Sequence, residues 1–344
     1  MNALLLTAPS QLALVDHPVP RPADDEVLVR IRACGICGSD IHGWDGSSGR
    51  RIPPLIMGHE AAGEIATVGA GAGDWRAGDR VTFDSTVFCG NCAPCRAGAT
   101  NLCAARRVLG VSTPDYRQHG AFAEYLAVPA RILHRLPATL AFEHAAMVEP
   151  VSIAIHAVRR VTIPPDATAV VIGAGMIGLF IVQALRWAGA ARIVAVDLEP
   201  GRLALARELG ATATLQSGTC NVPAEIARLT GGRGADFAFE AVGLTPTVQL
   251  AIDAVGRGGA VVLVGNLAPR IDFPLQSAVT RELTLHGTCG SAGEYPLCID
   301  LIAQGVIRVA PLISAIAPLS DGPGWFQRLG APGGGRHLKV ILQP

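Results

Sequence analysis

The sequence has little lysine, few aromatic residues and no net charge. Lys339 is the one lysine among 28 basic side chains, and aromatic residues make up 5% of the 344 residues. The 28 acidic side chains cancel the basic ones. A neutral chain lacks the general attraction that draws proteins to nucleic acid or anionic membranes, so we predict neither as a partner and expect a small-molecule ligand. We assign no function to the preference for arginine over lysine.

Charged residues are also scarce, at 16%, whereas 50% of the residues are hydrophobic. This balance excludes a disordered chain, and at roughly 150 residues per domain the length favours two domains. The uncharged residues 167–185 are long enough to span a membrane, but three glycines divide them into a strand and a helix. No basic segment precedes the first apolar stretch, as a secretory signal would require. We therefore expect a cytoplasmic protein.

The chain changes character near residues 164–165. Before this point, short β-rich runs such as residues 26–31 and 62–68 alternate with turns, which favours a compact, mostly β domain. After it, candidate strands alternate with helical patterns, which predicts an α/β domain with a doubly wound parallel sheet. The predicted strands of this second part are residues 169–172, 192–196, 236–240, 260–264 and 283–286.

Residues 173–178 read GAGMIG, a glycine pattern that follows a predicted strand and opens a predicted helix. In a dinucleotide-binding turn the first glycine permits the tight turn, the second lets the backbone approach a pyrophosphate, and the third allows close helix packing. The start of the helix offers free N–H groups to the phosphates. The predicted cofactor-binding residues are Gly173, Gly175, Met176, Ile177, Gly178, Asp197 and Arg202.

Asp197 lies at the end of the next strand, where a carboxylate accepts hydrogen bonds from the adenosine ribose and repels the extra phosphate of NADP. The sequence therefore predicts NAD. Arg202 is the one residue that favours NADP, because an arginine near this position can bind the 2′-phosphate.

Four of the nine cysteines lie in one glycine-rich and proline-rich loop: Cys89, Cys92, Cys95 and Cys103. The odd total and this crowding are poorly suited to a disulfide framework in a chain of this size. Four thiolates fill the tetrahedral coordination of one zinc ion and leave no position for a substrate, so we predict a structural zinc site. An iron–sulfur cluster and a nucleic-acid-binding zinc ribbon are the alternatives.

Three further motifs hold candidate ligands for a catalytic zinc ion. Cys37 lies within GICGSDIH, His59 and Glu60 within GHEAAGEI, and Glu149 within VEPVSIAIHAVRR. Catalytic zinc takes three protein ligands, and Cys37, His59 and a carboxylate would supply them. On a regular strand the side chains of His59 and Glu60 would face opposite sides. Either one of the two residues therefore lies outside the strand, or Glu60 contacts a zinc ligand rather than the zinc ion. We favour Glu149 as the third ligand, in an extended conformation at a helix start, directly before a proline. Glu60 then contacts a zinc ligand rather than the zinc ion, or exchanges with Glu149 as a ligand.

The order of these motifs, together with GDRV at residues 78–81, resembles the zinc-dependent medium-chain dehydrogenase superfamily, in its polyol or sorbitol dehydrogenase branch. The resemblance covers essentially the whole chain. It implies a GroES-like, mostly β catalytic domain at residues 1–155 and 291–344, with a Rossmann domain at residues 156–290 between them. It also implies that Ser39, His42 and Glu60 are catalytic, the first two as a proton relay, and that the protein is a homodimer or homotetramer.

Two positions depart from the sorbitol dehydrogenase pattern. Gly43 stands where those enzymes carry a tyrosine, and Thr288-Cys289 stands where they carry an arginine and a tyrosine. We predict a substrate pocket that has lost bulk and a positive charge, which argues against sorbitol itself.

The motifs together predict a reversible, NAD-dependent oxidation of a secondary hydroxyl of a polyol or sugar to a ketone, with one catalytic and one structural zinc ion per subunit. The same residues fit this chemistry on L-threonine, a simple secondary alcohol or a sugar phosphate. They also fit a non-catalytic NAD-sensing protein whose site residues are relics.

Overall fold

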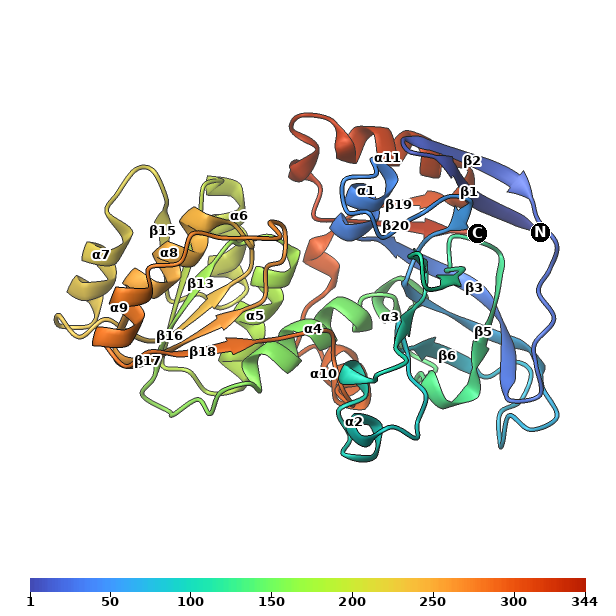
Figure 1. Ribbon diagram of the computed structural model, residues 1–344, viewed down its shortest axis with the longest axis horizontal. Helices are drawn as coiled ribbons and strands as arrows, with labels where there is room; N and C mark the ends of the chain where they lie inside the picture. Colours follow the sequence, from blue (N-terminus) through green and yellow to red (C-terminus); the bar gives the residue numbers. More distant parts are fainter. The chain divides into compact units, whose positions relative to one another are not determined.

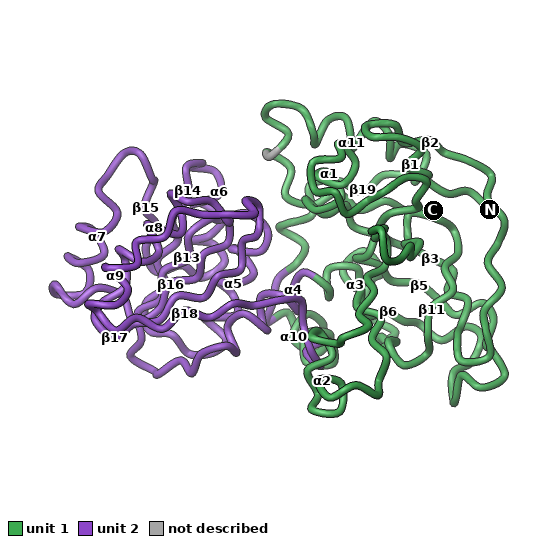
Figure 2. The backbone as a smooth tube through the Cα atoms, in the orientation of Figure 1, with its two compact units in different colours: residues 1–149, 295–305, 309–344 green, residues 150–294, 306–308 purple. Residues whose placement is uncertain are grey.

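The computed structural model describes residues 1–334 and 336–344, which form two compact units (Figures 1 and 2). Unit 1 comprises Met1–Glu149, Tyr295–Gly305 and Val309–Pro344, and unit 2 comprises Pro150–Glu294 and Val306–Arg308. We had placed the borders at residues 155/156 and 290/291. Helix α4 (Val148–Val158) runs through the first of these without a break. A continuous helix carries no turn signal, so the sequence alone could not place the change of unit within it.

Unit 1 is built on a seven-stranded sheet. Its strands are β3 (Glu26–Ile36), β5 (Glu60–Val68), β6 (Arg80–Phe83), β11 (Tyr125–Pro129), β12 (Leu133–Arg135), β19 (Ile313–Pro318) and β20 (Lys339–Gln343). They follow the order β12-β6-β5-β3-β20-β19, with β11 also paired to β3, and all pairs are antiparallel except β19 with β20. Val27, Leu28, Val29 and Ile31 of β3 are buried and Arg30 is exposed.

Shorter elements complete unit 1. A three-stranded sheet contains β2 (Gln11–Asp16), β1 (Asn2–Ala8) and β4 (Leu55–Ile56), and two small ribbons pair β7 (Thr86–Val87) with β8 (Arg107–Val108) and β9 (Val111–Ser112) with β10 (Arg117–Gln118). The helices are α1 (Gly38–Trp44), α2 (Ala93–Arg96), α3 (Phe142–Ala145), the first residues of α4, α10 (Tyr295–Ala303) and α11 (Gly322–Gly330). Figure 1 shows α1 beside α11, and the two helices are in contact.

The end of β3 brings together chain segments that are far apart in sequence. Gly35 pairs with Glu60, the first residue of β5, on one side and with Ile341 of β20 on the other. Lys339, the first residue of β20, therefore comes to the same end of the sheet as Glu60. Helix α1 begins directly after this point of the chain, so strand pairing alone collects the side chains of the site described below.

Unit 2 is a six-stranded sheet in which every pair is parallel. Its strands are β13 (Thr168–Ile172), β14 (Arg192–Asp197), β15 (Ala213–Gln216), β16 (Ala235–Glu240), β17 (Val255–Leu263) and β18 (Thr284–Gly287), and its own helices are α5 (Met176–Trp187), α6 (Pro200–Glu208), α7 (Val222–Leu229), α8 (Thr245–Ala254) and α9 (Leu275–Thr280). The order β15-β14-β13-β16-β17-β18 reverses direction between β13 and β16, which is the Rossmann arrangement. The mixed architecture confirms the predicted α/β class. Strand β15, at one edge, was not predicted.

Right-handed crossovers place α5 and α6 on one face of this sheet and α7 and α8 on the other. Packing of α5 with α6 and of α7 with α8 agrees with that division. The uncharged residues 167–185 form β13 and most of α5, as predicted. Within the described residues, no helix combines the length and the apolar character that a membrane crossing requires.

Gly178 supplies a test of the turn between β13 and α5. A Cβ at this position would overlap the carbonyl oxygen of Gly173, so we expect Gly178→Ala to destabilise unit 2 by about 1–3 kcal/mol and to weaken NAD binding. Gly201→Ala is the matched control, because its Cβ would meet no atom within 4 Å and its site lies in a helix. That change should leave stability unaltered or raise it by up to about 1 kcal/mol. Denaturant unfolding and NADH fluorescence titration measure both effects, and equal behaviour of the two variants would contradict the packing argument.

Candidate active site

Helix α1 has one exposed and one buried side. Ser39 and His42 are exposed, whereas Asp40 and Gly43 are buried. Residues three apart lie on the same side of a helix, so the two members of each pair are neighbours. The helix thus presents a hydroxyl and an imidazole outward and places a carboxylate inward.

Three residues of unit 1 converge as a candidate metal site. The ligand atoms of Cys37, His59 and Glu60 all lie within 4.8 Å of one another. His59 lies just before β5, which begins at Glu60, and Gly58 turns the backbone there with a φ of +92°, a conformation that favours glycine. Of the two arrangements open to this pair, the structure has the one in which His59 leaves the strand.

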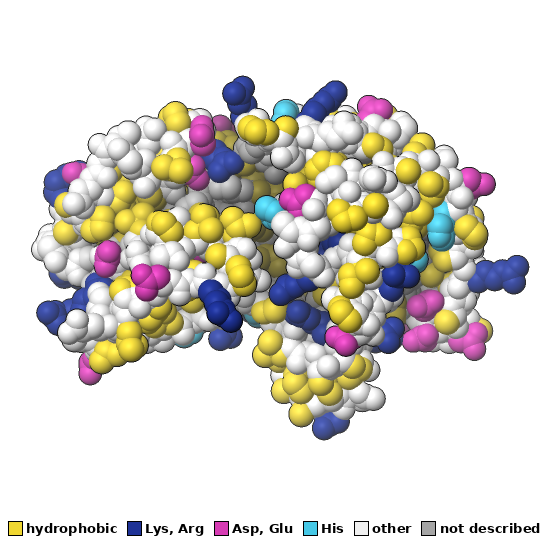
Figure 3. All heavy atoms as spheres, turned by 45° about the horizontal axis from the view of Figure 1, so that its top comes forward, with side chains coloured by type: hydrophobic (Ala, Val, Ile, Leu, Met, Phe, Trp, Pro, Cys, Tyr) yellow, Lys and Arg dark blue, Asp and Glu magenta, His cyan; other side chains and the backbone are white. Residues whose placement is uncertain are grey.

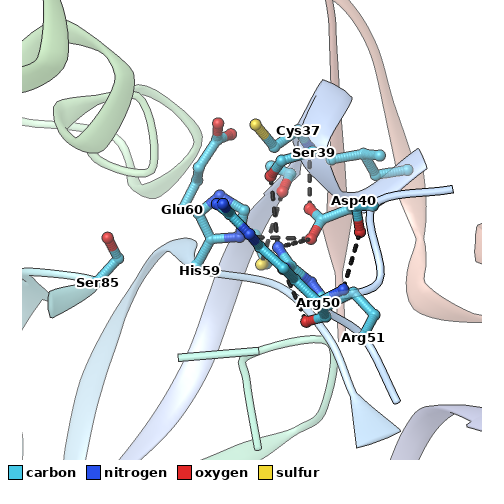
Figure 4. Close-up of polar contacts among 12 residues, drawn as sticks. Cys37, Ser39, Asp40, Arg50, Arg51, His59, Glu60 and Ser85 are labelled. Atoms are coloured by element: carbon cyan, nitrogen blue, oxygen red, sulfur yellow. Dashed lines mark hydrogen bonds and ion pairs between the residues drawn. The ribbon is translucent and has the colours of Figure 1, made fainter. Parts of the chain in front are cut away.

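Asp40 connects two of these residues. Its Oδ2 accepts a hydrogen bond from the backbone N–H of Cys37 (3.1 Å), and its Oδ1 lies 3.4 Å from both His59 Nδ1 and Arg51 Nη2 (Figure 4). Burial raises the pKa of Asp40, but the charges of His59 and Arg51 outweigh that effect and bring the pKa to about 2. With Nδ1 turned to Asp40, Nε2 is the ring nitrogen left for a metal. A carboxylate in this position fixes the orientation and tautomer of a metal-binding histidine.

Glu60 is paired with the single lysine of the chain. Lys339 Nζ donates to Glu60 Oε2 and, at 2.9 Å, to the carbonyl oxygen of Ile36, and both charged side chains are almost completely enclosed. Gly35 provides the space, because a Cβ there would overlap Glu60 Oε2. The second carboxylate oxygen, Oε1, is buried without a hydrogen-bond partner in the described part of the chain. A cation held by Cys37 and His59 would give this oxygen a partner, so the donor set fits a metal ion.

Glu149 lies outside this group of three. It sits in the first turn of α4, so the predicted helix start is confirmed and the predicted extended conformation is wrong. Pro150 is compatible with the helix because the N–H that proline lacks is not needed in the first turn. Ser85 Oγ donates to Glu149 Oε1 at 3.2 Å, and burial, opposed in part by the charge of His59, raises the pKa of Glu149 to about 7. A nearby cation would therefore decide the charge of this carboxyl group near neutral pH.

The space beside Gly43 is occupied by Arg51. A Cβ at position 43 would overlap Arg51 Cγ, so the aliphatic part of this arginine fills the volume that the missing side chain leaves. This contact does not define a substrate pocket, so the predicted loss of pocket bulk stays a prediction. Neither the sequence pattern nor the spacing signals this contact.

The four-cysteine loop is a second metal-binding group. The thiol sulfurs of Cys89, Cys92, Cys95 and Cys103 lie within 4.8 Å of one another, with separations of 3.4 Å (Cys92–Cys95), 3.9 Å (Cys92–Cys103) and 4.0 Å (Cys89–Cys95). Sulfurs placed tetrahedrally about 2.3 Å from one zinc ion are about 3.8 Å apart, so the cluster has the required size. Hydrogen bonds from the backbone at Ala104 and Cys95 lower the pKa of Cys92 to about 6, which favours the thiolate form that binds metals.

In unit 2, the predicted dinucleotide turn lies at the point where the strand order reverses. Gly173 follows β13 with a φ of +92°, Gly175 precedes the first residue of α5, Met176, and a Cβ at Gly175 would meet open space. Ile177 and Gly178 continue the helix. Open space over the backbone at Gly175 is what the approach of a pyrophosphate requires.

Asp197 is the last residue of β14, and its carboxylate is held next to this turn. Oδ2 accepts from the backbone N–H of Ala174 at 2.7 Å, and Oδ1 accepts from that of Glu199 at 2.9 Å. Arg202 Nη1 lies 3.7 Å from Asp197 Oδ2. The structure thus brings the glycine turn, the acidic residue and the arginine together, with the arginine directed to the carboxylate.

Charged side chains of both signs are scattered over the face seen in Figure 3 and do not gather over one element. The face seen in Figure 3 therefore carries no broad basic patch. The nine cysteines form no disulfide across the described residues.

Sequence analysis missed three residues of this site: Asp40, Arg51 and Lys339. Asp40 had a signal, since a carboxylate near a candidate metal-binding histidine commonly orients it. Lys339 had one too, because a single lysine in a chain rich in arginine is unusual. Arg51 had none, because its burial arises from a contact with Gly43 that only the folded chain shows.

Two protein-family models match this chain. Residues 23–138 match the alcohol dehydrogenase GroES-like domain, and residues 177–304 match the zinc-binding dehydrogenase domain. D-xylulose reductase A of Aspergillus oryzae is 33% identical over 336 residues, covering 95% of this chain and 92% of that protein. A structure from Sinorhizobium meliloti 1021 bound to NADP has a TM-score of 0.91 at 31% identity, covering 100% and 99% of the two chains. L-idonate 5-dehydrogenase of Escherichia coli K-12 has a TM-score of 0.91 at 26% identity, covering 100% and 98%.

The enclosed pair of Glu60 and Lys339 can be tested by removing its cation. Lys339→Met leaves the Glu60 charge buried without its partner, so we expect a loss of about 3–5 kcal/mol in the free energy of unfolding. Adding Glu60→Gln should recover most of this loss, because no unpaired charge then remains. Arg135→Met breaks the exposed pair with Asp79 and should cost less than about 1 kcal/mol. Denaturant unfolding measures all three variants, and equal losses for Lys339→Met and Arg135→Met would contradict a buried charge pair at Glu60 and Lys339.

Proposed function

The chain belongs to the zinc-dependent medium-chain dehydrogenase superfamily, and on that premise we propose that it oxidises a secondary hydroxyl of a polyol or sugar to a ketone, reversibly, with hydride transfer to NAD. The observation that carries the proposal is the convergence of Cys37, His59 and Glu60 in unit 1. Relatives named for a pentulose and for a hexonate support a polyhydroxylated substrate.

Cys37 and His59 hold the catalytic zinc, with a carboxylate as the third ligand. Bound zinc supplies a Lewis acid that stabilises negative charge developing on the substrate oxygen. An ionised Glu149 carboxylate would complete the ligand set, and Glu60 would either exchange with it or contact a ligand rather than the metal ion. A carboxylate oxygen of Glu60 lies near Cys37 and His59, which supports such an exchange, and Lys339 limits it by holding Oε2.

Ser39 and His42 move the proton that the substrate hydroxyl loses. The exposed Ser39 Oγ accepts it and relays it toward His42, whose imidazole releases it to water. Imidazole suits this step because its ordinary pKa lies near neutrality.

Unit 2 binds NAD, which supplies the hydride acceptor. Backbone N–H groups at the start of α5, after Gly175, face the pyrophosphate, and Asp197 binds the adenosine ribose. Arg202 is paired with Asp197 rather than extended to solvent, which supports NAD over NADP. We keep a homodimer or homotetramer as the proposed assembly. The absence of disulfides fits a reducing compartment, so we also keep the cytoplasm as the proposed location.

A panel of polyols, sugars, sugar phosphates, L-threonine and simple secondary alcohols tests the substrate class. With zinc-replete protein and NAD we expect NADH formation on one stereochemical series of polyols, and a much lower rate with NADP. Cys37→Ser should reduce turnover by at least about 100-fold, because it removes a metal ligand. Turnover on threonine or simple alcohols alone would refute the substrate class. Turnover unchanged in Cys37→Ser would favour a non-catalytic, NAD-sensing role for these residues.

Metal analysis tests the two zinc sites separately. The parent protein should contain two zinc ions per chain, and Cys92→Ser should contain one and unfold at a lower temperature, because structural zinc contributes directly to folding. Cys220→Ser, at an exposed cysteine in unit 2, should keep both ions. Iron in place of zinc in the four-cysteine loop would contradict the assignment.

A further inference from the structure

Arg51 is an arginine enclosed in the protein next to the candidate metal site. Its side chain is 6% exposed, and that of its partner Asp40 is 0% exposed. Nη2 lies 3.4 Å from both Asp40 Oδ1 and Ser39 Oγ, and Nη1 donates to the carbonyl oxygen of Arg50 at 3.3 Å. Figure 4 shows the guanidinium reaching Ser39 and Asp40 from a separate segment of the chain. One group thus contacts a residue of the proposed relay and the carboxylate behind the metal ligands.

A contribution to stability does not by itself explain why Arg51 is buried beside Asp40. A buried ion pair gains little over well-packed apolar residues, because desolvation offsets the attraction between the charges. Arg51 Nε is moreover buried without a hydrogen-bond partner among the described residues, which adds to the cost. The position is therefore better explained by what the guanidinium holds in place.

Asp40 is the group through which Arg51 acts on the metal ligands. Its two oxygens contact the backbone N–H of Cys37 and the ring of His59, so any movement of this carboxylate moves both. A metal-binding imidazole is neutral. When His59 has that role, Arg51 is the one side-chain cation within ion-pair distance of Asp40 in the described part of the chain.

The contact of Arg51 with Asp40 and Ser39 requires a glycine at position 43. Arg51 passes under α1 in the volume beside Gly43, where a Cβ would overlap its Cγ. The two positions are therefore coupled, since any side chain at 43 displaces the guanidinium from Asp40 and Ser39.

We propose that Arg51 is a positioning residue that orients Asp40, and through it Cys37 and His59, while fixing the hydroxyl of Ser39. This role rests on the proposed function for its effect on turnover, but its effect on metal binding does not. By donating to Ser39 Oγ, the guanidinium occupies one lone pair and leaves the other to accept the substrate proton.

Metal retention is the first test. Zinc-replete protein is equilibrated with increasing chelator, and zinc per chain is counted. Arg51→Met should lose one of two ions at a chelator activity about 10–100-fold lower than the parent, as expected when a group behind a metal ligand is removed. Arg51→Lys keeps the charge beside Asp40 and should recover most of this affinity. Gly43→Ala keeps the arginine but displaces it, and should resemble Arg51→Met. Arg50→Met, at the exposed neighbouring arginine, should match the parent.

Turnover is the second test, on whichever substrate the panel identifies. Arg51→Met should lower kcat at least tenfold while KM for NAD is unchanged, because the cofactor residues belong to unit 2. Arg51→Lys should remain slow although it retains zinc, because a lysine cannot contact Ser39 and Asp40 as the planar guanidinium does. In a Ser39→Ala background the kcat deficit of Arg51→Lys should largely vanish, since both changes affect the same hydroxyl.

One result would overturn the proposal: an Arg51→Met protein that retains both zinc ions as firmly as Arg50→Met does. If that protein also unfolds at a lower temperature, Arg51 is a merely structural residue. Because zinc retention needs no substrate, failure of the proposed reaction and failure of this inference are told apart.

Discussion

Two carboxylates, Asp40 and Glu60, are buried beside the residues proposed to bind zinc, and each is paired with an enclosed cation. The rest of the site depends on these two pairs. An unpaired buried charge either costs several kcal/mol or is neutralised by a change in protonation, and both would disorder the groups around it. Arg51 and Lys339 hold the carboxylates of Asp40 and Glu60 in place. Cys37 and His59 therefore lie beside two carboxylates whose positions are fixed.

Both pairs lie where glycines leave room. Gly35 provides the space for Glu60 and Lys339, and Gly43 provides it for Arg51. The first space lies at the end of β3, where pairing with β5 and β20 brings residues from three parts of the chain together. The second lies under α1, opposite the exposed Ser39 and His42. The fold thus holds the residues of the metal site from the buried side of α1 and leaves the relay residues accessible.

Patterns within short windows predicted much of this protein. The α/β class, the two kinds of domain, the glycine turn at Gly173 and the cysteine loop all follow from local spacing, because they are formed by neighbouring residues. The carboxylate of Asp197 was placed correctly next to the turn, since the spacing of a βαβ unit fixes it. Glu149 was expected to be extended because a proline follows it, but the first turn of a helix accommodates that proline.

Contacts between segments that are distant in the sequence could not be predicted. The Glu60–Lys339 pair joins residues 279 positions apart, and no local pattern encodes such a contact. Arg51 is one arginine among many, and only its place beside Gly43 distinguishes it. The contact that fills the space beside Gly43 was therefore not predicted.

The central claim is that the paired charges around Cys37 and His59 form a metal site distinct from the four-cysteine loop. Anomalous diffraction at the zinc edge, from crystals of the zinc-replete protein, tests it most directly. The account predicts two peaks per chain, one bonded to Cys37 Sγ, His59 Nε2 and a carboxylate of Glu60 or Glu149, and one among the four thiolates. A single peak in the cysteine loop, in protein that oxidises its substrate with NAD, would contradict the account.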